Sequence, residues 1–300
     1  MTDSKGQSTP IAEQVSQTVE ALRELEGLEF PRPERPVIIT VSNQKGGVGK
    51  TTTTVNLAAA LALGGLRVLV IDIDPQGNAS TALSVDHQVG TPGTYDVLVE
   101  GLPLIDTLQS CPDISGVTVC PASIDLAGAE VELVDRIGRE YLLDGALRDF
   151  LALDPDLDVV LIDCPPSLGL LTVNAFAAAD QVLMPIQAEY YALEGVSLLW
   201  STVERMRAHL NPRLRIEHIL LTMMDRRTRL SADVANEVRA HFPEETFVAD
   251  IPRTVRVSEA PGFGQTVVTY DPRSPGTVAY RQVALELAHR LAENGAAGGD

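Results

Sequence analysis

One stretch decides the fold of this 300-residue chain: Asn43-Gln44-Lys45-Gly46-Gly47-Val48-Gly49-Lys50-Thr51-Thr52. An apolar run, residues 37–41, precedes it, and an Ala/Leu-rich run, residues 55–63, follows it. A strand, a glycine-rich turn and a helix in this order are the context of a phosphate-binding loop. The glycines let backbone N–H groups turn inward, and the helix N-terminus adds partial positive charge. The stretch therefore predicts a site for nucleotide phosphates.

The loop departs from the standard pattern G-x-x-x-x-G-K-[ST]. Gln44 stands where its first glycine would fall, and Lys45 opens the loop. The pattern K-G-G-x-G-K-T resembles the deviant Walker A loop of the ParA/MinD ATPases. Lys50 is expected to reach the β- and γ-phosphates and Thr51 to hold Mg²⁺. The resemblance implies that Lys45 reaches the partner's nucleotide across a dimer interface. The expected ATP-binding residues of the loop are Lys45, Gly46, Gly47, Val48, Gly49, Lys50, Thr51 and Thr52.

Composition is typical of a globular protein with a sizeable core, because 45% of the residues are hydrophobic. No apolar run approaches the ~20 residues that span a bilayer, and no secretion signal opens the chain. We therefore expect a cytoplasmic protein. The cysteines Cys111, Cys120 and Cys164 fit neither a disulfide framework nor a tetrahedral zinc site, so we expect reduced, mostly buried thiols.

Charge is distributed unevenly. The net charge of −18 argues against global attraction to DNA or anionic lipid. Residues 205–256, however, contain ten arginines against seven acidic residues, a net +3, so the remainder of the chain carries −21. We expect any nucleic-acid surface to lie in this C-terminal third.

Residues 1–36 form an extension ahead of the predicted domain. Thr9-Pro10 can cap and start a helix, and proline-rich residues 30–36 predict a stiff linker. Apolar residues recur between them at helical spacing: Ile11, Val15, Val19, Leu22 and Leu25. This amphipathic helix either packs on its own domain or serves as a partner-binding or self-association arm. We expect an ATPase domain at 37–293 and a flexible tail at 294–300.

Strand-like and helical runs alternate after residue 37. The expected strands are 37–41, 67–73, 117–120, 158–162, 181–186, 216–222, 246–249 and 266–268, with helices notably at 193–209, 232–241 and 277–291. Most strand runs are continuously apolar, which suits strands buried on both faces. The chain is therefore predicted to be α/β, with a doubly wound, mostly parallel sheet, helices on both faces and ligands at the carboxyl ends of the strands.

Two predicted strands are followed by aspartates that suit phosphoryl transfer. Asp72-Ile73-Asp74-Pro75-Gln76-Gly77-Asn78 resembles the switch I segment of ParA proteins, which implies that Asp74 orients the attacking water and that Asp72 is structural. Asp163 ends an apolar strand and is followed by Cys164-Pro165-Pro166. This is a Walker B arrangement that places Asp163 near Mg²⁺ through water, and it resembles the family's D-x-P-P switch II.

The resemblance covers nearly everything after residue 37. Segments 185–195, 222–228, 251–261 and 270–274 are similar to ParA segments, and together these motifs are typical of the Soj-type, chromosomal-style branch. They imply a P-loop NTPase fold of the deviant Walker A type, with ATP and Mg²⁺ as cofactors and with Met224 and Pro252 near the adenine. The implied reaction is slow, partner-stimulated hydrolysis of ATP to ADP and phosphate.

The resemblance also implies partners. These are a second copy of the chain in the ATP-bound state, nonspecific double-stranded DNA at the nucleoid, and a ParB-type centromere-binding protein. The implied DNA-contacting residues are Arg227 and Arg256, with Arg226, Arg229 and Arg253 beside them. Phosphate contacts from arginine give affinity without sequence information. Each arginine has the alternative role of an ordinary surface ion pair.

The same scaffold can serve other functions. A MinD-like protein needs a basic amphipathic anchor, but residues 292–300 contain no Lys or Arg, and the N-terminal helix is acidic. We therefore expect no membrane partner. The cysteine spacing does not match a reductase like the nitrogenase iron protein, and a biosynthetic ligase remains an alternative. The alternative of another class is a nucleotide-switched localisation scaffold for non-DNA cargo, which need not bind DNA.

Overall fold

A central sheet organises the computed structural model, which describes residues 10–190, 192–225 and 227–297. Within these residues, seven strands lie in the order β3-β4-β2-β5-β1-β6-β7. Neighbouring strands are parallel except β3 and β4, which pair antiparallel at one edge. The strands are β1 (Val37–Val41), β2 (Val68–Asp72), β3 (Gln109–Ser110), β4 (Val117–Cys120), β5 (Val159–Asp163), β6 (Gln181–Gln187) and β7 (Arg215–Thr222). The mostly parallel sheet of the prediction is confirmed.

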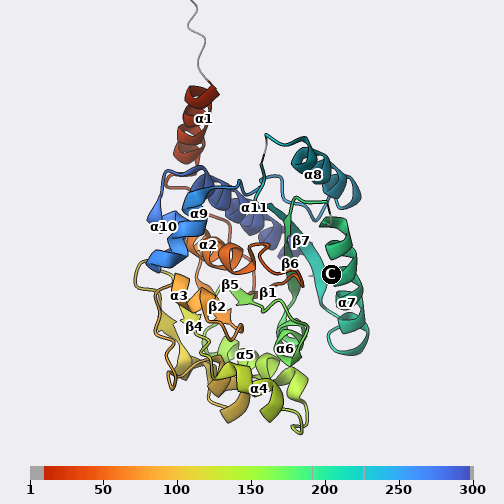
Figure 1. Cartoon of the computed structure of the whole chain (residues 1–300). Helices are drawn as coiled ribbons and strands as arrows, with labels where there is room; N and C mark the ends of the chain where they lie inside the picture. Colours follow the sequence, from red (N-terminus) through yellow and green to blue (C-terminus); the bar gives the residue numbers. More distant parts are fainter. Residues whose placement is uncertain (1–9, 191, 226, 298–300) are drawn as a thin grey trace, which may run out of the picture.

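Helices cover both faces of the sheet (Figure 1). They are α1 (Pro10–Leu25), α2 (Lys50–Leu63), α3 (Asn78–Ala82), α4 (Leu126–Glu132), α5 (Leu142–Leu153), α6 (Leu170–Ala178), α7 (Ala192–His209), α8 (Arg229–His241), α9 (Val255–Glu259), α10 (Val267–Tyr270) and α11 (Pro275–Ala297). Short 3₁₀ or π turns lie at Asp96–Glu100, Leu104–Thr107, Arg139–Tyr141 and Ala260–Phe263. The last helix thus extends past residue 293, where the sequence analysis placed the end of the domain.

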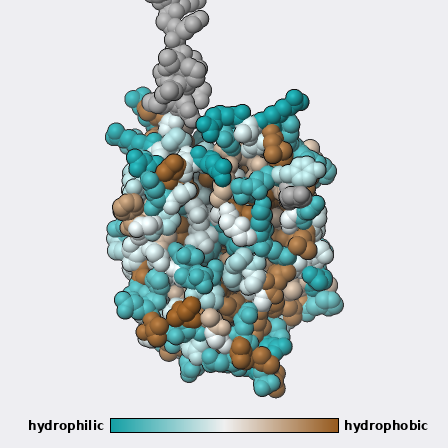
Figure 2. All heavy atoms as spheres, in the orientation of Figure 1, coloured by the Kyte–Doolittle hydropathy of each residue, from teal (hydrophilic) through white to brown (hydrophobic). Residues whose placement is uncertain are grey.

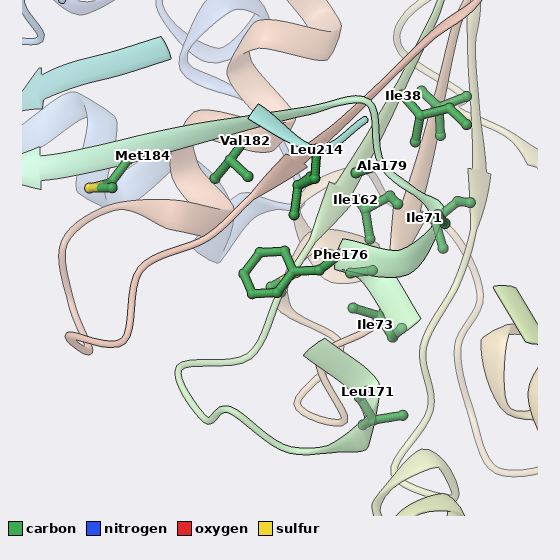
Figure 3. Packing of buried hydrophobic residues seen from close by; sticks show 14 of the residues in the cluster. Ile38, Ile71, Ile73, Ile162, Leu171, Phe176, Ala179, Val182, Met184 and Leu214 are labelled. Carbon is green, nitrogen blue, oxygen red and sulfur yellow. The ribbon is translucent and has the colours of Figure 1, made fainter. Parts of the chain in front are cut away.

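Two apolar clusters lie on opposite faces of the sheet. Successive side chains of β2 alternate between them, because side chains of a strand point to opposite faces in turn. Leu69 and Ile71 join the cluster under α5, α6 and α7, whereas Val68 and Val70 join the cluster under α2 and α11. Figure 3 shows part of the first cluster, where Phe176 of α6 lies near side chains from several strands. The continuous apolar strands are therefore explained by burial on both sides.

Two predicted strands are wrong. Residues 246–249 make only an isolated bridge, between Thr246 and Ile219 of β7, and Val248 is 82% exposed. Residues 266–268 begin a helix instead, because the Thr266 side chain accepts a hydrogen bond from the Thr269 backbone N–H and so caps α10. Both segments contain β-branched residues, which favoured the strand prediction, but strand pairing and helix capping decide the outcome.

The N-terminal extension is attached to the domain at several points. The α1 helix contacts α11, and its residue Leu25 is buried. Phe30, assigned to the linker from sequence, packs in the cluster with α2 and α11 and donates its N–H to the Gly64 carbonyl at 2.9 Å. The three cysteines are free and buried, as expected.

Candidate nucleotide site

The phosphate-binding loop lies at the carboxyl end of β1 and leads directly into α2. Gly47 and Gly49 have φ angles of 75° and 90°, a region that side-chain-bearing residues rarely adopt. The hydroxyl of Thr222, the last residue of β7, donates to the Val48 carbonyl at 2.8 Å. Sequence reasoning did not single out Thr222, whose contact depends on two distant segments meeting. The contact attaches the loop to the neighbouring strand end.

Lys50 is the first residue of α2 and is only 7% exposed. Its Nζ lies 3.5 Å from the Lys45 carbonyl oxygen inside the loop. Burial lowers the pKa of Lys50, and the negative charge of Asp163 opposes that effect. A buried ammonium within a loop of backbone donors is suited to bind an anion.

Asp163 accepts two hydroxyl hydrogen bonds from the first turns of α2. Thr51 donates to one carboxylate oxygen at 2.7 Å and Thr54 to the other at 2.8 Å. The predicted pair of Thr51 and Asp163 is therefore brought together. Thr54 was missed, although its position one turn after Lys50 on the same helix could have indicated it. Burial raises the pKa of Asp163, and the threonine hydrogen bonds oppose that rise.

Asp72 and Asp163 are register partners at the carboxyl ends of β2 and β5. Both are fully buried, and burial together with the neighbouring carboxylate raises the pKa of Asp72. Asp72 accepts hydrogen bonds from Ser80 Oγ, from the Ser80 N–H and from the Asp74 N–H. The structural role expected for Asp72 agrees with these contacts, which fix the loop that carries Asp74.

Asp74 lies on that loop and is 8% exposed. One of its oxygens accepts the Gln76 N–H at 3.0 Å. Its negative charge acts on both Lys50 and Asp163. The carboxylate expected to orient water is thus grouped with the residues expected to bind phosphate and metal.

The Lys45 side chain contacts a residue outside its own loop. Its Nζ forms an ion pair with Glu189 at 2.7 Å, and both side chains are 45% exposed. The Lys45 backbone N–H bonds to the side chain of Asn43, which also donates to the Pro185 carbonyl. Glu189 follows β6 and was not expected as a partner of this lysine.

Met224 and Pro252, the two residues expected near adenine, lie together just past β7. They form an isolated parallel bridge, held by hydrogen bonds from Met224 N–H to the Ile251 carbonyl and from Arg253 N–H to the Met224 carbonyl. Both line a cavity of about 810 Å³. Met224 is two residues beyond Thr222, which contacts the phosphate-binding loop.

Most of the described arginines that are expected to contact DNA form ion pairs at the surface. Arg227 forms two hydrogen bonds with Asp225 at 2.9 Å, which holds the pKa of Asp225 at about 2. Arg229 pairs with Asp233 and Arg256 with Glu259 and Asp271, whereas Arg253 is exposed and lowers the pKa of Asp225 through its charge. Arg226 lies outside the described residues. Exposed pairs of this kind are weak and sensitive to salt.

The surface around these arginines is mainly hydrophilic. Figure 2 shows mostly hydrophilic residues on the upper part of the body, where Figure 1 places α8 and α9. Apolar groups are more frequent toward the lower end of the same view, near α4. Among the described residues, Ile137 is 99% exposed and Val131 is 75% exposed.

The site offers oxygen donors and a buried cation in one place. Oxygen atoms of a threonine and an aspartate, 2.7 Å apart, are the donor set that Mg²⁺ prefers beside phosphate oxygens. The neighbouring Cys164 is fully buried, and its Sγ lies 3.0 Å from the Thr40 hydroxyl. The arrangement suits a phosphorylated ligand carrying a hard divalent cation.

The sequence resembles known proteins over most of its length. A family model described as an AAA domain matches residues 37–216. The sporulation initiation inhibitor protein Soj of Bacillus subtilis is 50% identical over 86% of this chain and 99% of its own length. The chromosome partitioning protein ParA of Caulobacter vibrioides is 50% identical over 84% of this chain and 94% of its own. This chain belongs to the ParA/Soj family of chromosome-partitioning ATPases.

A solved structure supports the ParA/Soj fold. A Mycobacterium smegmatis protein named cobyrinic acid a,c-diamide synthase is 39% identical with a TM-score of 0.72, covering 85% of this chain and 95% of that one. It has been solved with ADP and magnesium and with an ATP analogue and magnesium. In this ParA/Soj family member, no described helix is both long and apolar enough to cross a bilayer.

Proposed function

We propose that this protein is an ATP-driven DNA-segregation switch. The observation that carries the proposal is the grouping of buried Lys50, the Thr51–Asp163 pair and Asp74 at one end of the sheet. Lys50 and the backbone of residues 45–52 bind the phosphates of ATP. Thr51 and Asp163, whose side chains are hydrogen-bonded, would hold Mg²⁺. When bound, Mg²⁺ neutralises charge on the phosphate oxygens.

Asp74 orients the water that attacks the γ-phosphate. The position of Asp74 after β2 supports this role, because its negative charge acts there on both Lys50 and Asp163. ATP hydrolysis is slow until a partner protein stabilises the arrangement in which Asp74 orients the water. We assign that role to a ParB-type centromere-binding protein, which the resemblance of the sequence motifs to ParA proteins implies.

Two copies of the chain associate when ATP is bound. Lys45 then leaves Glu189 and contacts the nucleotide of the opposite subunit, which its exposed position permits. The γ-phosphate stabilises the dimer, and its loss separates the subunits. Nucleotide thus biases a two-state equilibrium through contacts that only one state makes.

The ATP-bound dimer binds DNA through arginines of the C-terminal third. Arg227, Arg229, Arg253 and Arg256 are exposed, and Arg226 belongs to the same sequence motif. Phosphate can replace the carboxylate in an exposed pair, so the binding is independent of sequence and sensitive to salt. In the cell the protein would be cytoplasmic and associated with the nucleoid.

The test measures phosphate release and DNA retention by the full chain with ATP, with ADP and without nucleotide. We expect duplex binding only with ATP, and faster release of phosphate when DNA and a ParB-type protein are present. The Lys50→Ala variant controls for contaminating ATPase. ATP turnover without any DNA binding would instead favour the localisation scaffold for non-DNA cargo.

A second candidate is an amide-forming ligase, which the name of the Mycobacterium smegmatis structure favours. The same assay distinguishes it. A ligase would release phosphate in proportion to an added carboxylic acid and ammonia source, and DNA would leave its rate unchanged. The partition function predicts the opposite response to both additions.

A further inference from the structure

The cavity of about 810 Å³ beside the nucleotide site has a wall from the N-terminal extension. Met224 and Pro252 lie on one side of it, and Thr18 and Ala21 of α1 lie on another. Residues 18 and 21 are three positions apart, so they share one face of the helix. The extension therefore reaches the part of the molecule where the base of a nucleotide is expected.

The position of α1 is fixed by anchors at its C-terminal end. Arg281 of α11 donates a hydrogen bond to the Leu25 carbonyl, and Leu25 is 4% exposed. Further along, the Phe30 ring packs directly on Gly64, and Arg32 donates to the Gly65 carbonyl at 2.7 Å. These contacts hold the segment that follows α1 on the core. The described part of the helix thus has a defined place at the cavity.

The remaining walls combine apolar side chains with the charged side chains of Asp225, Arg227, Asp250 and Arg253. Val278 and Ala279 of α11 line the cavity together with Ala249. The backbone of Met224 is already paired with Ile251 and Arg253, so this wall is rigid and presents side chains to the cavity. The volume lies within the roughly 300–1,000 Å³ of small-molecule sites, which are mostly apolar with a few polar groups.

The cavity is also connected to the phosphate-binding loop. Thr222 bonds the loop at Val48, and Met224 enters the cavity wall two residues later. A nucleotide with its phosphates at the loop would therefore have its base directed along this short segment. Arg227 and Arg253, which the proposed function assigns to DNA, line this cavity beside Asp225 and Asp250, so its charges balance, whereas DNA phosphate requires a net cationic surface.

We propose that α1 completes the base-binding cavity, with Thr18 and Ala21 facing the purine and ribose of the bound nucleotide. The inference rests on the proposed function, because it takes the glycine-rich loop as the nucleotide site. The family model covers residues 37–216, so α1 lies outside it, as do the other residues that line the cavity. The extension thereby becomes a determinant of nucleotide affinity.

The test compares full-length variants that fill the cavity with one that does not. Ala21→Trp places a large side chain in the cavity. Thr18→Phe fills the cavity from the preceding turn of the helix. It replaces Ala21→Trp in the test if that variant does not fold stably. Val19→Trp is the matched control, because Val19 is 41% exposed and does not line this cavity. Affinities for ATP, ADP and inorganic tripolyphosphate are measured by calorimetry.

We expect the two filling variants to weaken ATP and ADP binding by roughly tenfold or more, with tripolyphosphate affinity unchanged. Val19→Trp should bind all three ligands like the wild type. Unchanged ATP affinity in both filling variants would overturn the proposal. Equal losses for ATP and tripolyphosphate would also overturn it, because the base would not be the affected group.

Two further results separate this inference from the proposed function. Lys50→Ala should lose both ATP and tripolyphosphate binding, and its failure to do so would refute the nucleotide site itself. Loss of DNA binding by Ala21→Trp at normal ATP affinity would assign the cavity to DNA and reject a base there. If Lys50→Ala loses ATP binding as expected and the two filling variants keep wild-type ATP affinity, only the role of α1 is refuted.

Discussion

Replacing Asp74 tests whether its carboxylate acts in ATP hydrolysis rather than in ATP binding. Asp74→Ala should retain ATP affinity and dimerisation, because Lys50 and the loop donors remain, but should lower the hydrolysis rate by roughly 10²–10⁴-fold. Phosphate release at saturating ATP measures the effect. Asp86→Ala, an exposed carboxylate after α3, is the control and should keep wild-type turnover. Wild-type rates in Asp74→Ala would show that another group orients the water.

Two substitutions separate the role of Lys45 across the dimer interface from its ion pair with Glu189. Lys45→Ala should bind ATP through Lys50 yet fail to dimerise, because two cross-subunit cations are lost. Glu189→Gln should release Lys45 from the pair seen here and preserve ATP-dependent dimerisation. Light scattering with and without ATP measures the mass. If both variants dimerise normally, Lys45 has no role across the interface; if both fail, the intrasubunit pair is what matters.

At the residue level, local patterns predicted more than distant contacts did. The loop and the Walker B aspartate follow from short motifs, and the structure brings Thr51 and Asp163 together as expected. Glu189 lies 144 positions from Lys45, and nothing in either segment indicates their contact. A side chain's partner outside its own element depends on how the sheet assembles, which a motif does not encode.

At the level of elements, one contact of the extension, that of Phe30, depends on a glycine. A Cβ at Gly64 would lie 2.3 Å from the Phe30 ring, so the end of α2 accepts Phe30 only because residue 64 lacks a side chain. The proline-rich sequence around Phe30 predicted a linker, and it did not predict that Phe30 packs on Gly64. The wrong strand at 266–268 has a similar origin, since a threonine cap rather than β-propensity decides that segment.

Gly64→Ala should therefore destabilise the protein by about 1–3 kcal/mol through overpacking. Chemical denaturation measures the free energy of unfolding. Gly145→Ala in α5 is the control: no atom lies within 4 Å of its added Cβ, so it should be neutral or stabilise by up to ~1 kcal/mol. In a Phe30→Ala background the Gly64→Ala cost should largely disappear, because the clash is with that ring. Equal costs in both backgrounds would contradict the packing explanation.

At the scale of the whole molecule, charge is distributed unevenly along the chain. Net negative charge outside residues 205–256 repels DNA from most of the surface, while the arginine-rich third lies near α8 and α9. The sequence alone located this asymmetry, because charge counts need no fold. It did not reveal that Arg227, Arg229 and Arg256 are held by carboxylates in this state.

DNA binding by these arginines is tested through its salt dependence. A site of Z phosphate contacts has a log–log salt slope of about −0.9Z, and each substitution removes two contacts from a symmetric dimer. Arg227→Ala and Arg256→Ala should each flatten the slope by roughly 2, and the Glu variants should nearly abolish binding at physiological salt. Fluorescent duplexes of two unrelated sequences, titrated with ATP and with ADP, give the affinities.

The matched control is Arg148→Ala, which removes an exposed, ion-paired arginine from α5, away from α8 and α9. It should leave the slope unchanged, because residue 148 lies outside the arginine-rich third. If Arg227 and Arg256 act only as ion pairs, their variants would lose some stability and keep full DNA affinity. Because the rest of the chain carries −21, no other surface is expected to compensate for the lost contacts. Unchanged affinity in both variants would therefore reject this DNA surface and favour the cargo scaffold.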